Sequence, residues 1–136
     1  MNHITCDIQL ELTSRGIEYR SLDGVVVKSL ERDMRKTFCD QHKAGDPLWE
    51  AVSDPESFYH AAGDEFADAF FRHRQEKIYI LIDDWDGLSG LFVENASGLY
   101  TSIKAMYSFR WYVSDIALTY LICKNDHDFV IYSTAD

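Results

Sequence analysis

The sequence predicts an α+β fold, in which helices from the N-terminal half pack on a mainly antiparallel sheet from the C-terminal half to give two layers. Between residues 28 and 45, apolar residues recur every four positions, the period of an amphipathic helix. Between residues 109 and 133, apolar and polar residues alternate in short runs, the period of strands. With 136 residues, 46% of them hydrophobic, the chain is expected to form a single domain over residues 1–136.

The first helix is expected in CDIQLELTSR, residues 6–15, because Ile8 and Leu12 are four positions apart and Gly16 follows as a stop. An alternative interpretation keeps part of this run as a strand. The next run, residues 17–30, holds two β-prone stretches on either side of an Asp-Gly pair. Because that pair suits a tight turn, the run predicts a β-hairpin.

A second helix is expected from Lys28 onward. Leu30, Met34 and Phe38 recur at intervals of four, and charged residues occupy the faces between them. This pattern predicts one buried stripe and one solvated face. The helix is expected to end by Gly45.

Two Asp-Pro pairs follow, and each suits the start of a helix because proline is favoured at the first helical position. Asp46-Pro47 predicts a short helical turn, and Asp54-Pro55 predicts a longer helix. Gly63 is expected to break the longer helix and Asp64 to cap its second half. The apolar face of this segment is aromatic and consists of Phe58, Tyr59, Phe66, Phe70 and Phe71.

The run IYILID, residues 78–83, is apolar on both of its faces, as in a central strand that is covered on both sides. LFVE, residues 91–94, predicts a second strand. Between the two, DWDGLSG, residues 84–90, is expected to form the loop of a hairpin. ASGLYTSIKAMYS, residues 96–108, predicts a helix with Ser97 as its cap.

Three strands are expected at the C-terminal end of the chain. They are FRWYVSD, residues 109–115, TYLICK, residues 119–124, and FVIYS, residues 129–133. The connections between them are short and polar. Because short connections join antiparallel neighbours, these runs predict a meander.

Acidic residues dominate the charge of the chain. There are 23 acidic and 13 basic residues, a net charge of −10, and residues 51–100 alone carry ten acidic and three basic residues, a net of −7. Such a surface disfavours direct binding of nucleic acid, which depends on cationic contacts to phosphate. It would attract a basic protein partner instead. The alternative is that the acidity serves solubility alone.

No motif indicates a cofactor, a disulfide framework or a membrane segment. Cys6, Cys39 and Cys123 are an odd, widely spaced set, and the five histidines form no metal-binding pattern. No apolar run approaches the ~20 residues that cross a bilayer, and MNHITCDIQL lacks the basic flank and apolar stretch of a secretory signal. A cytoplasmic protein without a cofactor is therefore expected.

Candidate partner-binding residues lie in three acidic segments. The first is the helix expected after Asp54, which carries five carboxylates and no cation before Arg72. The second is the hairpin tip, and the third is the NDHD turn at residues 125–128. The predicted set is Asp54, Glu56, Asp64, Glu65, Asp68, Asp83, Asp84, Trp85, Asp86, Asp126 and Asp128. The alternative for the helix is a solvated face, because acidic side chains near a helix N-terminus are favourable on dipole grounds alone.

The hairpin tip matches a metal site poorly. A calcium loop needs oxygen ligands at alternate positions, and counting from either Asp83 or Asp84 places too few of them there. A looser magnesium site using Asp84 and Asp86 with His127 or Asp128 is the alternative, and no metal is predicted. Trp85 among the carboxylates has the composition of an interface anchor, or else its ring folds back on the sheet.

The C-terminal pattern FRWYVSDIALTYLICKNDHDFVIYS, following IYILIDD and a short helix, resembles small bacterial cytosolic domains. Some of these are similar to immunity proteins of contact-dependent growth inhibition and other polymorphic-toxin systems. The resemblance covers residues 76–133 and consists of strand composition and aromatic spacing. It implies a cytoplasmic inhibitor that binds one toxin domain tightly. Immunity proteins have many folds and share no functional residues, so no residue role is carried over.

The sequence therefore favours a protein–protein interaction over catalysis. The predicted function is an immunity protein that neutralises a cognate toxin domain, a basic nuclease, because a carboxylate surface imitates the polyanion that a nuclease binds. One alternative is a small metal-dependent hydrolase built on Asp83, Asp84 and Asp86 with His127 and Asp128. The other is a regulatory interaction domain. The oligomeric state is left open.

Overall fold

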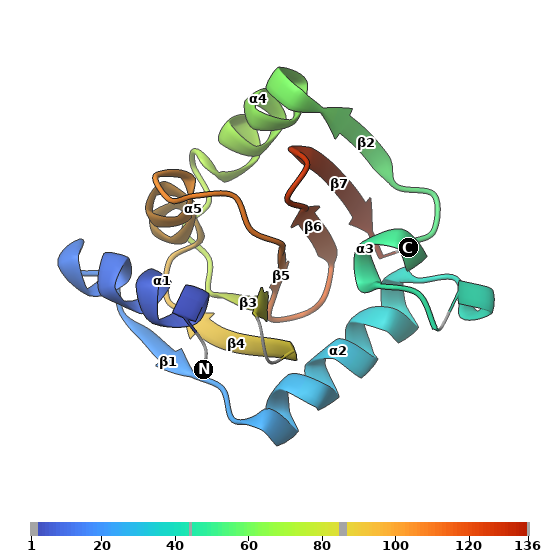
Figure 1. Ribbon diagram of the computed structural model, residues 1–136, viewed down its shortest axis with the longest axis horizontal. Coiled ribbons are helices and arrows are strands. Elements are labelled where there is room, and N and C mark those ends of the chain that lie inside the picture. The colour runs from blue at the N-terminus through green and yellow to red at the C-terminus, as the bar shows by residue number, and fades with distance from the viewer. Residues whose placement is uncertain (1–2, 44, 85–86, 136) are drawn as a thin grey trace.

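The computed structural model describes residues 3–43, 45–84 and 87–135 (Figure 1). The helices are α1 (His3–Ser14), α2 (Gly24–Phe38), α3 (Leu48–Ala51), α4 (His60–Phe71) and α5 (Ala96–Lys104), with a 3₁₀ turn at Gln41–Lys43. The strands are β1 (Tyr19–Ser21), β2 (Glu56–Tyr59), β3 (Ile78–Asp84), β4 (Gly87–Val93), β5 (Trp111–Asp115), β6 (Tyr120–Lys124) and β7 (Phe129–Thr134). No helix among the described residues is long and apolar enough to cross a membrane.

The strands form one sheet in the order β1-β4-β3-β5-β6-β7-β2, and every pair of neighbours is antiparallel. β3 is an interior strand between β4 and β5, where Ile80 lies opposite Leu91 of β4 and Val113 of β5. The predicted pairing of β5 with β6 is confirmed, with Tyr112 opposite Cys123. The N-terminal half of the chain supplies the two edge strands, β1 and β2.

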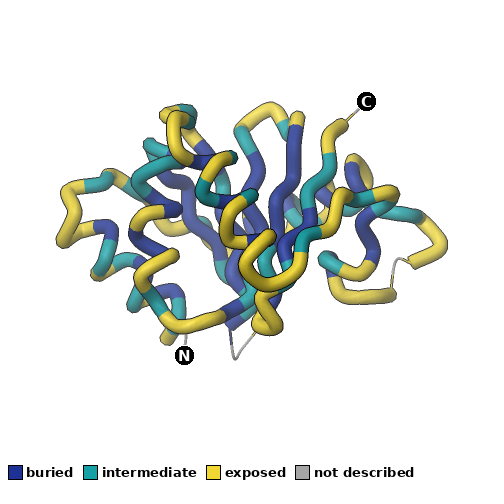
Figure 2. Tube along the Cα trace, turned by 90° about the horizontal axis from the view of Figure 1, so that it is seen from above, coloured by how far each residue is buried: buried dark blue, intermediate teal, exposed yellow. Residues whose placement is uncertain are grey.

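Helices cover both faces of the sheet, as Figure 1 shows. Alternate residues of β3 explain why, since Ile80 packs in a cluster with α1, α4 and α5, and Leu81 packs in a second cluster with α2 and α3. The predicted α+β class is confirmed. The helices form a layer on each face, where one layer was expected, because a strand that is apolar on both sides must be covered on both. Figure 2 shows the buried strands enclosed by more exposed segments.

The hairpin predicted for residues 17–30 is wrong. Tyr19–Ser21 is a strand, but the Asp-Gly pair starts a helix instead of making a turn. The Asp23 carboxylate accepts a hydrogen bond from the backbone N–H of Val26 at 3.0 Å, which is the geometry of an N-cap. α2 therefore begins four residues before Lys28, and its buried stripe gains Val27.

The helix predicted to start after Asp54 is also wrong in its first half. Glu56–Tyr59 pairs with β7 as a strand, and α4 begins at His60. Gly63 does not break α4. A Cβ atom at this position would lie 3.1 Å from Cγ2 of Val130 and 3.2 Å from the carbonyl oxygen of Phe58. The glycine thus lets the helix approach β7 closely, and Asp64 lies within the helix rather than at a cap.

The remaining elements agree with the predictions apart from their ends. α1 ends before Gly16, whose φ of 71° is in the left-handed region that favours glycine. The loop predicted for residues 84–90 is too long, because Asp84 pairs with Gly87 and β4 begins there; the residues between these two lie outside the described part of the chain. α5 ends at Lys104, and its cap is Asn95 instead of Ser97, since the Asn95 side chain accepts the N–H of Gly98 at 2.8 Å.

Candidate functional site

Antiparallel pairing brings several predicted acidic residues together at one end of the sheet. The C-terminal ends of β2, β3 and β6 lie there beside the N-terminal ends of β5 and β7. Asp83 is at the end of β3, Asp126 and Asp128 are in the β6–β7 turn, and Asp64 is in the second turn of α4. We name these four residues, Asp64, Asp83, Asp126 and Asp128, the acidic rim.

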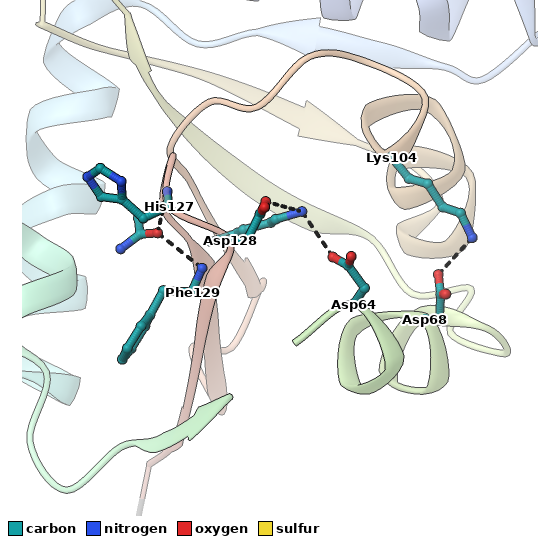
Figure 3. A network of polar contacts seen from close by, with 8 residues as sticks. Asp64, Asp68, Lys104, His127, Asp128 and Phe129 are labelled. Carbon is teal, nitrogen blue, oxygen red and sulfur yellow. Dashed lines mark hydrogen bonds and ion pairs between the residues drawn. The ribbon is translucent and has the colours of Figure 1, made fainter. Parts of the chain in front are cut away.

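Two basic residues hold the acidic rim together, and each serves two carboxylates. Arg110 lies 3.3 Å from the Asp83 carboxylate and 3.4 Å from that of Asp126. Lys124 lies 3.2 Å from the Asp64 carboxylate and 3.7 Å from that of Asp128 (Figure 3). Four carboxylates thus share two cations, and the rim keeps a negative charge. Such partly exposed pairs stabilise the fold little.

The β6–β7 turn is held in shape from within. The buried Asn125 side chain accepts the backbone N–H groups of His127 at 2.9 Å and Phe129 at 3.1 Å (Figure 3). Asp128 has a φ of 58°, in the left-handed region that aspartate tolerates better than most residues. The turn therefore presents Asp126 and Asp128 to solvent in a fixed arrangement.

Asp84 has a different role from the rim residues, although it follows Asp83 directly. It is 5% exposed, and its carboxylate accepts both the backbone N–H and the hydroxyl of Thr5, each at 3.1 Å. The Thr5 hydroxyl also contacts the Ser89 hydroxyl. Asp84 therefore connects the first turn of α1 to the β3–β4 hairpin, and we do not place it in the acidic rim.

The acids of residues 54–68 do not share one helical face. Asp54 and Glu56 lie before and on β2, and both are exposed. Glu65 is exposed on α4. Asp68 faces α5, where its carboxylate lies 2.8 Å from Nζ of Lys104 (Figure 3). The hydrogen bond from Lys104 lowers the pKa of Asp68.

Aromatic side chains lie beside the acidic rim. Trp85, the predicted anchor, and Asp86 lie outside the described residues. Tyr59, at the end of β2, is 58% exposed, and its ring packs edge to face on Phe129 at 4.3 Å between centroids. Sequence patterns missed this tyrosine as a surface residue because they assigned it to the apolar face of a helix.

A second exposed tyrosine lies at the other end of the acidic rim. Tyr107 is 54% exposed, and its hydroxyl donates to the Asp7 carboxylate at 2.7 Å. Together with Asp83 and Asp126 it lines an open depression of about 380 Å³. The carboxylates of this end of the sheet are thus flanked by an aromatic side chain on each side.

The residues of the hydrolase alternative do not converge in the described part of the chain. Asp83 pairs with Arg110, Asp84 with Thr5, and Asp128 with Lys124. The His127 side chain is 80% exposed. Among residues 3–43, 45–84 and 87–135, no group of three or more histidine, cysteine, aspartate or glutamate side chains could hold a metal ion.

The fold and site define an α+β protein with a seven-stranded antiparallel sheet and a carboxylate-rich rim at one end of it. Comparison with known proteins finds no matching family model, no similar curated protein and no similar solved structure.

Proposed function

We propose that this protein is an immunity-type inhibitor that binds and neutralises a cognate toxin domain, a basic nuclease, in the cytoplasm. The acidic rim is the observation that supports this function best. Its four carboxylates share two cations, and their side chains are between 36% and 58% exposed. A cationic surface placed against the rim would therefore reach every one of these carboxylates.

The charge of the rim suits a nuclease in particular. A nuclease must be cationic where it holds the phosphate backbone, and the rim offers it a fixed array of anions in place of phosphates. Arg110 and Lys124 each pair with two carboxylates. A cation from the partner could therefore also pair with these carboxylates without displacing Arg110 or Lys124. Long-range attraction between the two charged surfaces would also speed their encounter.

Tyr59 supplies the apolar part of such an interface. Tyrosine is enriched among the residues that contribute most to binding energy, because it buries a large ring and retains a polar end. The ring of Tyr59 is supported edge-on by Phe129, so little conformational entropy is lost when a partner covers it. Tyr59 is the last residue of β2 and immediately precedes α4, next to the acidic rim.

The direct test measures binding to the toxin domain encoded beside this chain in its genome, and protection of cells from that domain. We expect a dissociation constant near or below about 10 nM, a binding free energy of about 11 kcal/mol. The double variant Asp126→Asn/Asp128→Asn should bind more slowly. The double variant Asp33→Asn/Glu50→Gln changes the net charge equally at exposed positions outside the rim, and it should bind like the parent. Failure to bind or protect against any neighbouring toxin would remove the proposal.

A further inference from the structure

β2 is an edge strand whose outer side is unpaired within the described part of the chain. The sheet order ends at β2, and its neighbour there is β7. Glu56, Ser57 and Tyr59 are exposed, whereas Phe58 packs against the core. An open edge of this kind is a ready template for another strand.

The backbone of β7 shows which groups of β2 point outward. The backbone carbonyl of Phe129 accepts a hydrogen bond from the backbone N–H of Asn125. The backbone N–H and C=O of Phe129 therefore point toward β6. Because these groups alternate along a strand, those of Val130 point toward β2, where its partner is Phe58. The backbone groups of Phe58 therefore point inward. Those of its two neighbours, Ser57 and Tyr59, point away from the sheet.

A second hydrogen bond leads to the same orientation. The N–H of His60 donates to the carbonyl oxygen of Asp128 at 2.9 Å. The peptide bond between Tyr59 and His60 is trans, so the carbonyl of Tyr59 points the opposite way, away from β7, where it is at the N-cap of α4 and accepts the first hydrogen bond of that helix. Ser57 thus presents an N–H donor and a C=O acceptor at the open edge, and Tyr59 presents an N–H donor.

The edge at the other end of the sheet is built differently. β1 has three residues, and its side chains are tied to α1. The Ser21 hydroxyl accepts from Gln9 at 2.7 Å, and the Tyr19 hydroxyl lies 3.4 Å from that of Thr13. Arg20 covers the ring of Phe92 and places a cation on this edge, a common way to discourage strand addition.

Charge indicates what would pair with β2. Glu56 is on the strand, Asp54 precedes it, and the rim residues Asp64 and Asp128 lie at its far end. The sequence contains no lysine or arginine between Lys43 and Arg72. A second copy of this chain would bring the same carboxylates face to face, with a net charge of −10 on each copy. An extended cationic segment would neutralise them.

We propose that an extended, lysine- or arginine-rich segment of the partner adds to β2 as a further antiparallel strand, through the backbone groups of Ser57 and Tyr59. This inference rests on the proposed function and names the way in which the cationic partner attaches. Backbone hydrogen bonds hold the segment, and its basic side chains meet the carboxylates at both ends of β2.

The test uses the whole chain and the capped peptide acetyl-Thr-Lys-Val-Lys-Val-Lys-Thr-amide, with amide hydrogen exchange followed by NMR. At a peptide concentration ten times its dissociation constant, exchange at Ser57 and Tyr59 should slow about tenfold. Exchange at Phe58, which already bonds to β7, should not change. A matched peptide of equal charge carries N-methyl groups on two adjacent central residues, so that both of its edges are blocked. This peptide should protect neither Ser57 nor Tyr59.

The variant Ser57→Pro checks the orientation from the protein side. It removes an outward N–H and leaves the β2–β7 hydrogen bonds in place, so its melting temperature should stay within about 2 °C while the peptide no longer protects Tyr59. Phe58→Pro, its matched control, removes an inward N–H and should melt clearly lower. If Ser57→Pro fails to fold, comparison of the two peptides on the parent protein still tests the proposal.

Equal binding of both peptides without protection of Ser57 and Tyr59 would overturn the inference. So would slow exchange at these residues in the free protein that increases with its concentration, because the edge would then pair with a second copy. A toxin domain that binds the acidic rim and leaves both amides unprotected would retain the proposed function and exclude strand addition. Peptide protection without any toxin binding would retain the open edge as a binding site and exclude the immunity function.

Discussion

The carboxylate of Asp84 accepts the backbone N–H and the hydroxyl of Thr5, a residue 79 positions earlier in the chain. This contact fastens the first turn of α1 to the β3–β4 hairpin. It also supplies an acceptor to one of the N–H groups that a helix start leaves without an intrahelical partner. Asp84 therefore stabilises the fold, whereas its neighbour Asp83 is part of the surface.

Replacing Asp84 by alanine should destabilise the fold. Hydrogen bonds to a charged group contribute about 1.5–3 kcal/mol, and the change would leave the Thr5 groups without this acceptor in a buried place. We expect the free energy of unfolding in urea to fall by about 2–3 kcal/mol. Asp83→Ala, which removes only a partly exposed ion pair, should change it by less than about 1 kcal/mol. Equal effects of the two substitutions would contradict the assignment.

Gly63→Ala should destabilise the protein although alanine is the better helix former. The added methyl group would lie 3.1 Å from Cγ2 of Val130 and force α4 away from β7. Overpacking of this kind costs about 1–3 kcal/mol, against a gain of about 1 kcal/mol in helix propensity. Gly24→Ala, where nothing lies within 4 Å, should be neutral or stabilising. The comparison is a pair of thermal melts, and a more stable Gly63→Ala would refute the close approach.

Salt should separate the electrostatic share of binding from the rest. Raising the ionic strength from low to several hundred millimolar should cut the association rate with the toxin domain far more than it speeds dissociation. Screening acts on long-range attraction before it acts on desolvated contacts. The association rate should depend less steeply on ionic strength in Asp126→Asn/Asp128→Asn, and as steeply as in the parent in Asp33→Asn/Glu50→Gln. Surface plasmon resonance at several salt concentrations measures both rates.

Tyr59→Ala should change the dissociation rate more than the association rate, the opposite of the effect of salt. If the tyrosine anchors the partner, its loss should cost about 2 kcal/mol or more, mostly as faster dissociation. The melting temperature should barely move, because the ring is 58% exposed. Unfolding of the variant, with binding per folded molecule unchanged, would make Tyr59 a structural residue. Trp85→Ala, predicted from the sequence to act in the same way, is the companion variant.

The three cysteines should react with a thiol reagent at very different rates. Cys6 is exposed, whereas burial raises the pKa of Cys39 to about 11 and that of Cys123 well above its usual value. The thiolate is the reactive form, so at a pH of about 8 we expect fast labelling of Cys6 alone. A raised pKa stabilises the fold below the unfolded value near 9, and this contribution is lost as the pH rises toward 11. Rapid labelling of Cys39 in the folded protein would contradict its partial burial and raised pKa.

The sequence alone determined the elements whose pattern lies in consecutive residues. The stripe of Leu30, Met34 and Phe38 predicted α2, and the apolar run of residues 78–83 predicted a central strand. Alternation over residues 109–133 predicted the order and direction of β5, β6 and β7. In each case a period of about four or of two residues shows which face must be buried, whatever lies against it.

Tertiary structure decided the elements that two local conformations fit equally well. Residues 56–59 carry a pattern that suits a helix, and they became β2 because β7 offered an unpaired edge and Gly63 let α4 pack over Val130. The acidic rim has the same origin. Asp64, Asp83, Asp126 and Asp128 come from separate segments, and only the order of the strands brings them to Arg110 and Lys124. Strand order depends on contacts between distant residues, which no pattern within a short run contains.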